Sequence, residues 1–182
     1  MNVSIPYTLE TERLLLRRLI PADHQPFADF ICNPEATRYM VFTPEQKTYE
    51  GARAMLDWVM QSYDTEEPIY VLAITLKGQH VYIGSVGAAP LDSPSELEIF
   101  YTLRTAYQHV GYAVEATRRL LQHLFEHKTV ERVFAYVMPE NQASIRVARS
   151  LGMAYKGDVE RNGLTGQQYM MQRDQVVVQP DL

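Results

Sequence analysis

Hydrophobic and polar positions along the chain alternate between a period of two and a period of three to four residues. Short apolar runs rich in β-branched residues and bounded by turn residues predict strands. These runs cover residues 12–19, 69–76, 81–88, 96–103, 132–138, 153–160 and 167–172. Apolar residues three and four apart predict helices at about 22–31, 48–63, 112–125 and 141–151. The order predicts a mixed α and β fold with one strand–helix–strand crossover near the centre.

Single residues refine this pattern. Gly84 and Gly87 lie inside the predicted strand 81–88, which indicates a bulge or the close approach of another group. Trp58 lies in a predicted helix, and packing is favoured over chemistry. Residues 162–166 read Asn-Gly-Leu-Thr-Gly and predict a turn between the last two strands, after which the tail to Leu182 looks loose.

Composition suits one compact domain that spans residues 1–182. The chain has 46% hydrophobic residues, which is enough for a sizeable core. A formal net charge of −5 gives no electrostatic footprint for direct nucleic-acid binding. The single cysteine, Cys32, provides neither a disulfide framework nor a thiolate cluster for a metal, and we expect a small buried residue there.

Several other classes of site lack their signature in the sequence. Neither Gly-x-Ser-x-Gly nor Gly-x-x-x-x-Gly-Lys-Ser/Thr occurs, and the histidines lack His-Glu-x-x-His spacing. His123 and His127 are four residues apart on a predicted helix and could bind a metal, but surface polar positions are favoured. Residues 1–9 do not read as a signal peptide and no apolar run approaches membrane length, so we expect a cytoplasmic protein without membrane attachment.

The stretch 101–116 combines a strand, a short polar turn and the start of the longest predicted helix. Gly111 stands at the mouth of that helix, where a ligand can approach the backbone closely. The first N–H groups of a helix lack intrahelical partners and attract anions with the help of the helix dipole. The stretch therefore fits a phosphate-binding loop, and the alternative is a turn glycine with no ligand.

Three motifs carry a resemblance to a known family. Gln108, Gly111 and Ala113 match the Gln/Arg-x-x-Gly-x-Gly/Ala motif that cradles the pyrophosphate of acetyl-CoA in GNAT N-acetyltransferases. The opening Thr-Glu-Arg-Leu-Leu-Leu-Arg at 11–17 and the Asn-Gln-Ala-Ser-Ile-Arg-Val at 141–147 resemble the RimJ/RimL branch, which acetylates the N-termini of ribosomal proteins. His109 departs from the pattern, because the family usually has a second glycine there.

The resemblance implies a GNAT fold of the α+β class. This fold is a single domain, here with its core at about 10–173, whose mostly antiparallel central sheet is splayed at the acetyl-CoA site and flanked by helices. The implied cosubstrate is acetyl-CoA, with no metal. The residues implied to bind it through the loop and through free backbone N–H groups of the preceding strand are Tyr101, Thr102, Leu103, Gln108, His109, Val110, Gly111, Tyr112, Ala113 and Val114.

Direct acetyl transfer needs a neutral amine, a stabilised oxyanion and a proton for the departing thiolate. Glu98 corresponds to the acidic residue of the branch's Glu-x-Gly-Tyr strand motif and is the candidate base. A solvated or ion-paired strand glutamate is the alternative, and Glu96 and Glu160 are spare candidates. Asn141 resembles the family asparagine that contacts the pantetheine arm, although capping of its helix explains it equally well.

The proton donor is implied by the same branch. Many GNAT enzymes have a tyrosine seven residues after that asparagine, where this chain has Ala148. The branch uses a serine three residues after the asparagine, which makes Ser144 the candidate donor, and a small residue on a packed helix face is the alternative. Residues 36–47 look irregular and fit either a core plug or part of an acceptor pocket.

The implied reaction is acetylation of a primary amine by direct attack in a ternary complex. A protein or peptide N-terminus ranks ahead of a small-molecule amine as the acceptor, and we expect a monomer or a homodimer. The alternative function is a catalytically degenerate GNAT fold that binds CoA or a peptide without turnover, because of His109 and Ala148.

Overall fold

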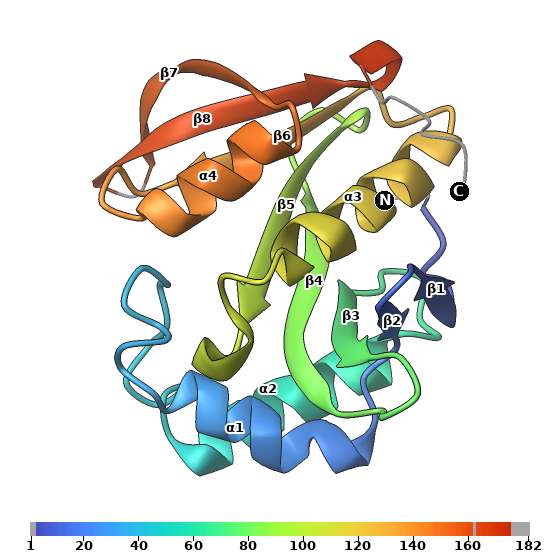
Figure 1. The fold of residues 1–182 in the computed structure, drawn as a ribbon, viewed down its shortest axis with the longest axis vertical. Coiled ribbons are helices and arrows are strands. Elements are labelled where there is room, and N and C mark those ends of the chain that lie inside the picture. Colours follow the sequence, from blue (N-terminus) through green and yellow to red (C-terminus); the bar gives the residue numbers. More distant parts are fainter. Residues whose placement is uncertain (1–2, 162, 176–182) are drawn as a thin grey trace.

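The computed structural model describes residues 3–161 and 163–175, in which eight strands form one sheet (Figure 1). The strands are β1 (Thr8–Glu10), β2 (Leu14–Arg17), β3 (Tyr70–Leu76), β4 (Tyr82–Pro90), β5 (Glu96–Leu103), β6 (Arg132–Val137), β7 (Ala154–Arg161) and β8 (Leu164–Gln172). Their order is β1-β2-β3-β4-β5-β6-β8-β7, and the pairing is antiparallel except between β5 and β6. The expected α+β architecture with a mostly antiparallel sheet is confirmed.

Four α-helices flank this sheet in the described residues: α1 (His24–Ile31), α2 (Tyr49–Ser62), α3 (Tyr112–Glu126) and α4 (Gln142–Ser150). The helix α3 is the crossover between the parallel strands β5 and β6, and it packs on β2, β4 and β5. Its buried side chains, among them Leu120 and Leu124, recur at helical spacing. None of the helices among the described residues has the length and hydropathy needed to cross a membrane.

The sheet splits between β5 and β6. Their parallel register runs from Glu96 opposite Arg132 to Glu98 opposite Phe134 and goes no further, although β5 continues to Leu103 and β6 to Val137. Beyond this short ladder the two strands diverge, and the α4, β6, β7 and β8 region separates from the rest of the sheet (Figure 1). The expected splay is therefore present, and it exposes the edge of β5 at residues 99–103.

The two glycines of β4 confirm both sequence interpretations. The register with β3 shifts between Ile74 and Thr75, which is the bulge expected near Gly84. A Cβ atom at Gly84 would lie 2.1 Å from the carbonyl oxygen of Thr102, so the glycine also permits close approach. Gly84 thus lets β4 lie close against the end of β5, beyond the point at which β6 has left that strand.

The strand expected at 12–19 is present as β2, which is shorter and covers Leu14–Arg17. Its partner β1 was not expected, and the two strands form a hairpin across a turn at residues 11–13. Side chains of this turn bind Glu115, 102 to 104 residues away, a contact that local periodicity cannot reveal. The last hairpin is also longer than expected, because β8 begins at Leu164 instead of residue 167. Residues 176–182, where most of the expected loose tail falls, lie outside the described residues.

Two neighbouring arginines form ion pairs of different kinds. Arg17 donates two hydrogen bonds of 2.7 and 2.8 Å to Asp23, which is 2% exposed. Asp23 also accepts a 3.0 Å hydrogen bond from the backbone N–H of Ile20 and thereby fixes the entry into α1. Arg18 binds Asp64, whose side chain is 85% exposed. The first pair is part of the interior, whereas in the second pair the carboxylate lies in solvent and only the arginine is largely buried.

Candidate active site

Two cavities meet at the splay. The larger, of about 690 Å³, is lined by residues of the 39–42 loop, α2, β5, β6 and the β7–β8 hairpin. The smaller, of about 520 Å³, is lined by residues 108–109 and 111–114, the end of β5 and the outer side of α4. Residues common to both are Phe30, Tyr39, Met40, Tyr101, Thr102, Asn141 and Ser144. Groups bound in the two cavities would therefore meet beside the exposed edge of β5.

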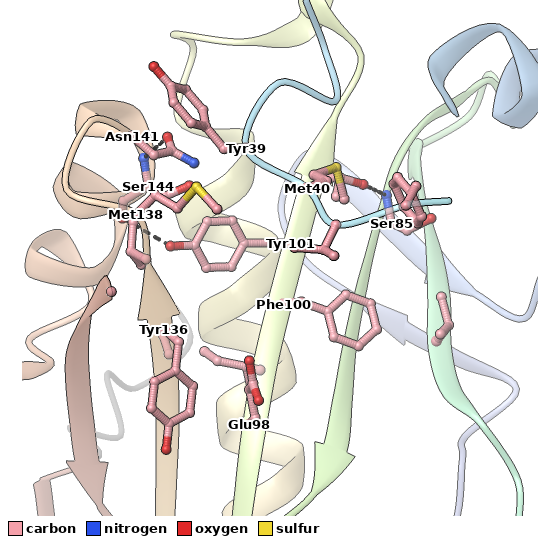
Figure 2. A pocket seen from close by; sticks show the side chains of 18 of the residues that line it. Tyr39, Met40, Ser85, Glu98, Phe100, Tyr101, Tyr136, Met138, Asn141 and Ser144 are labelled. Atoms are coloured by element: carbon pink, nitrogen blue, oxygen red, sulfur yellow. Dashed lines mark hydrogen bonds between the residues drawn. The ribbon is translucent and has the colours of Figure 1, made fainter. Parts of the chain in front are cut away.

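Side chains of β5 are divided between the core and the larger cavity. Leu97 and Ile99 are buried in the core, whereas Glu98, Phe100 and Thr102 alternate onto the other face. Glu98, Phe100 and Thr102 all border the larger cavity. Figure 2 shows Glu98, Phe100 and Tyr101 in sequence along this strand. One face of β5 thus presents the carboxylate of Glu98, the ring of Phe100 and the side chain of Thr102 to the larger cavity.

The loop before α3 has the geometry of an anion site. Gly111 has φ of +88° and His109 has φ of +64°, so both lie in the left-handed region that favours glycine. The first intrahelical hydrogen bond runs from the N–H of Glu115 to the carbonyl of Gly111, and the N–H groups of residues 112–114 precede it. His109 is exposed and borders the smaller cavity. The left-handed backbone of His109 would be less strained with a glycine at this position.

Gln108 acts within the loop. Its side-chain amide donates a 3.0 Å hydrogen bond to the carbonyl of Leu103 at the end of β5. This bond joins the end of the splayed strand to the loop that leads into α3. Gln108 therefore holds the loop that carries Gly111 against the end of β5. Its side-chain amide is used within the protein, which leaves the backbone N–H groups of the loop as the donors for a ligand.

The hairpin turn at 11–13 supports the same loop. Glu115 accepts hydrogen bonds from the hydroxyl of Thr11 and from the backbone and side chain of Arg13, at 2.6 to 2.9 Å. Arg13 also donates to the carbonyl of Val110 at 3.1 Å and stacks over the ring of Tyr112. The opening motif of the chain is thus attached to both sides of Gly111, and Arg13 brings a positive charge beside the smaller cavity.

Replacing Glu115 with Gln is expected to lower stability by about 1–2 kcal/mol at neutral pH, since Arg13 is half-exposed. Burial alone would raise the pKa of Glu115, but the hydrogen bonds from Thr11 and Arg13 and the charge of Arg13 hold that pKa below its ordinary value. The stabilisation is therefore present above the unfolded pKa of about 4.3 and is lost as pH falls through the lower folded pKa.

Urea unfolding from pH 7 to pH 3 would measure this difference. The gap between wild type and Glu115→Gln should shrink in acid, and Glu12→Gln, an exposed glutamate of the same turn, is the matched control. A gap that stays constant across the pH range would mean that the carboxylate charge plays no part in holding the hairpin to α3.

Replacing Gly111 with Leu is expected to weaken acetyl-CoA binding at least about tenfold while the domain still folds. The left-handed backbone strains any L side chain, and the new Cβ would lie 3.3 Å from the flexible end of Arg13. The control is Gly78→Leu, because Gly78 has φ of +80° in an open turn with nothing within 4 Å of the new Cβ. Calorimetric affinities that are equal for the two variants would show that the 108–114 loop does not contact the ligand.

Glu98 forms an ion pair in the larger cavity. Its carboxylate accepts a 2.8 Å hydrogen bond from Arg161, whose guanidinium lies 4.0 Å from the centre of the Tyr136 ring. The ion-paired alternative for Glu98 is therefore present, and the carboxylate still borders the cavity. Neither Glu96, which binds Arg132, nor the exposed Glu160 lines either cavity.

The start of α4 lies at the junction of the cavities. Asn141 accepts a 3.1 Å hydrogen bond from the N–H of Ser144, so it does cap the helix, and its position also borders both cavities. The hydroxyl of Tyr101 donates a 3.0 Å hydrogen bond to the carbonyl of Ser144 (Figure 2). Burial raises the pKa of Tyr101 well above its ordinary value, so the hydroxyl stays protonated. Ala148 is fully buried in the core.

Other residues differ from their expected positions. Trp58 was expected to pack instead of taking part in chemistry, but its side chain is 65% exposed and borders the larger cavity. Cys32 is half-buried instead of fully buried. The irregular loop packs as a core plug, because Met40 and Phe42 contact a small core cluster around Phe30, and the same two residues also line the larger cavity.

Three site residues lacked a signal in the sequence. Arg161 joins Glu98 from 63 positions away, Phe100 occupies an ordinary strand position, and Tyr101 was expected to contribute only its backbone. In the part of the chain that the structure describes, no group of three or more His, Cys, Asp or Glu side chains could hold a metal. His123 and His127 have rings 5.2 Å apart, and His123 is more buried than a surface position would be.

A splayed β5–β6 pair, with a glycine turn and a helix N-terminus beside it, is the arrangement that acetyltransferases of the GNAT type share. The pattern of the acetyltransferase (GNAT) domain family matches residues 13–154, and this chain belongs to that family. It is an acyltransferase.

One relative agrees with this assignment, and two solved structures share the fold. An uncharacterised N-acetyltransferase, p20 of Bacillus licheniformis, is 31% identical over 82% of this chain and 84% of its own. The ribosomal-protein-S5-alanine acetyltransferase of Vibrio fischeri has a TM-score of 0.74 at 17% identity, covering 93% of this chain and 98% of its own. The microcin C7 self-immunity acetyltransferase MccE, solved with acetyl-CoA and AMP, has a TM-score of 0.76 at 17% identity, covering 89% and 93%.

Proposed function

We propose that the protein transfers the acetyl group of acetyl-CoA to a primary amine, with a peptide or protein N-terminus as the acceptor. The observation that carries the proposal is the junction of two cavities at the edge of β5 that the splay leaves free. The smaller cavity suits the thioester because it borders the helix N-terminus and the left-handed loop. The larger cavity is left for the acceptor. The N-terminal preference rests on the motif resemblance and on the name of the Vibrio fischeri neighbour.

The chain's own groups can support each step of a direct transfer. The amine nitrogen bonds to the thioester carbonyl carbon, and the oxyanion that forms accepts hydrogen bonds from the backbone N–H groups of Tyr101, Thr102 or Leu103. Collapse of this intermediate breaks the carbon–sulfur bond. One proton of the ammonium passes to Glu98 through water before the attack. As the carbon–sulfur bond breaks, the hydroxyl of Ser144 protonates the thiolate and regains a proton, through water, from the nitrogen that becomes the amide.

Residues around the junction would hold the cosubstrate. The N–H groups of residues 112–114 would donate to a pyrophosphate at the start of α3, and Arg13 would supply positive charge nearby. His109 and Val110 form the turn, and Asn141 stands where the pantetheine arm would pass into the splay. This assignment is supported by the cavity's shape and by acetyl-CoA in the structure of MccE.

Two measurements test the proposal together. Calorimetric titration with acetyl-CoA should give a Kd in the micromolar-to-millimolar range. Incubation with acetyl-CoA and a panel of amines, including short peptides, should release free thiol in proportion to acetylated product. A heat of binding with acetyl-CoA, but no release of CoA thiol with any amine, would indicate a CoA-binding protein without turnover. Absence of heat would remove acetyl-CoA as the cosubstrate.

A further inference from the structure

Large apolar side chains from separate elements converge on the larger cavity without being buried. Val41 in the loop is 80% exposed, Trp58 in α2 is 65% exposed and Phe100 in β5 is 36% exposed. Leu164 in β8 adds a fourth such side chain. Exposed apolar groups gathered around one concave site mark a surface that binds another apolar group.

Phe100 is held in place by the opposite strand. It pairs in register with Gly87 of β4, and a Cβ at Gly87 would lie 2.4 Å from the tip of the Phe100 ring. The ring therefore lies across β4 in space that only a glycine leaves free. This makes Phe100 a fixed apolar wall of the cavity.

The position of Phe100 fixes what it can contact. It lies two residues from Thr102, and side chains two residues apart on one face of a strand are about 7 Å apart. An amine beside the edge of β5 at Thr102 would thus direct its nearest substituent towards Phe100. Glu98, two residues further along and paired with Arg161, places a carboxylate at the wall of the cavity that an ammonium group would enter.

We propose that the larger cavity selects an acceptor N-terminus whose first residue carries a large apolar side chain. The proposal rests on the proposed amine acetylation and adds its specificity, with Val41, Trp58 and Phe100 as the determining contacts. A volume of about 690 Å³ exceeds one aromatic side chain and leaves room for the chain that follows. Burial of such a side chain favours it over a small polar one by about ten- to a hundredfold in kcat/KM.

Trp58 gives a direct measure of binding, because it is the only tryptophan of the chain. Tryptophan fluorescence is titrated with two tripeptides, phenylalanyl-glycyl-glycine and seryl-glycyl-glycine, which have similar N-terminal amines and differ in the first side chain. The phenylalanyl peptide should change the emission at concentrations at least about tenfold lower. Acetylation of both peptides, and of phenethylamine, is measured through the release of free CoA thiol.

The variant pair is Val41→Ser and Val81→Ser. Val81 is also an exposed valine, but it lies before β4 and borders neither cavity. Val41→Ser should reduce the preference for the phenylalanyl peptide at least about threefold, and Val81→Ser should leave it unchanged. A fluorescence preference without any thiol release would remove the proposed function and keep the selectivity of the cavity.

Three results would overturn the inference. Equal kcat/KM for the two peptides would show that the cavity does not select an apolar first residue, although amine acetylation would stand. Equal effects of the two valine variants would locate selectivity elsewhere. Acetylation of phenethylamine with none of either peptide would replace the N-terminal acceptor by a small apolar amine.

Discussion

Replacing Glu98 with Gln is expected to lower kcat by roughly ten- to a thousand-fold, most clearly at pH values below the pKa of the acceptor amine. A free N-terminal amine has a pKa near 8, so a carboxylate in the cavity has to remove a proton from most of the bound amine at neutral pH. The variant also leaves the Arg161 charge without its partner in the cavity, and that charge repels an ammonium group.

The control for this prediction is Glu96→Gln. Glu96 also lies on β5 and forms an ion pair, with Arg132, but it borders neither cavity, so its replacement should leave kcat unchanged. Steady-state kinetics from pH 6 to pH 9 would separate the possible roles. An unaltered kcat for Glu98→Gln would mean that solvent, and not Glu98, accepts the proton of the amine. A raised KM with normal kcat would mean that Glu98 binds the acceptor. Ser144→Ala should have a smaller effect on kcat.

Replacing Asp23 with Asn is expected to destabilise the protein by about 3–5 kcal/mol. The change would leave the guanidinium of Arg17 largely buried without a full opposite charge, and removal of one partner from a buried pair is far more harmful than removal from an exposed one. Loss of the carboxylate also weakens the hydrogen bond from Ile20 that sets the start of α1.

Denaturant unfolding at neutral pH would measure this effect against Asp64→Asn. That variant removes the partner of the adjacent arginine, but Asp64 is exposed, so the expected change is about 0–1 kcal/mol. The paired design separates burial from ion-pair chemistry. Similar losses for the two variants would mean that the Arg17–Asp23 pair contributes no more than a surface contact.

Elements with strong local signals could be predicted from the sequence. The strand at 96–103 was predicted with the bounds that β5 has, and the long helix differs from α3 by one residue at its end. The start of α4 was also readable, because Asn141 caps it through Ser144. In each case the periodicity, the cap or the glycine turn lies within the element itself.

Features that depend on distant partners could not be read in this way. The 11–13 turn joins β1 to β2, and hydrogen bonds of Thr11 and Arg13 to Glu115 on α3 hold it in place. Trp58 lies on the exposed side of α2, which can be interpreted only once the cavity wall opposite it is known. Arg161 reaches Glu98 only because the β7–β8 hairpin folds back beside β5, and no spacing in the sequence links residues 98 and 161.

The short parallel ladder between β5 and β6 has a consequence for dynamics. One piece of the molecule contains β6, β7, β8 and α4. It is joined to the first five strands by the ladder at residues 96–98, by contacts of α3 with α4, and by the hydrogen bonds of Tyr101 to Ser144 and of Arg161 to Glu98 (Figure 1). A thioester bound in the splay would contact both pieces and restrict their relative motion. Amide hydrogen exchange should then slow along β6 and β8 as well as at the loop, because their rigid-body breathing about this hinge would be suppressed.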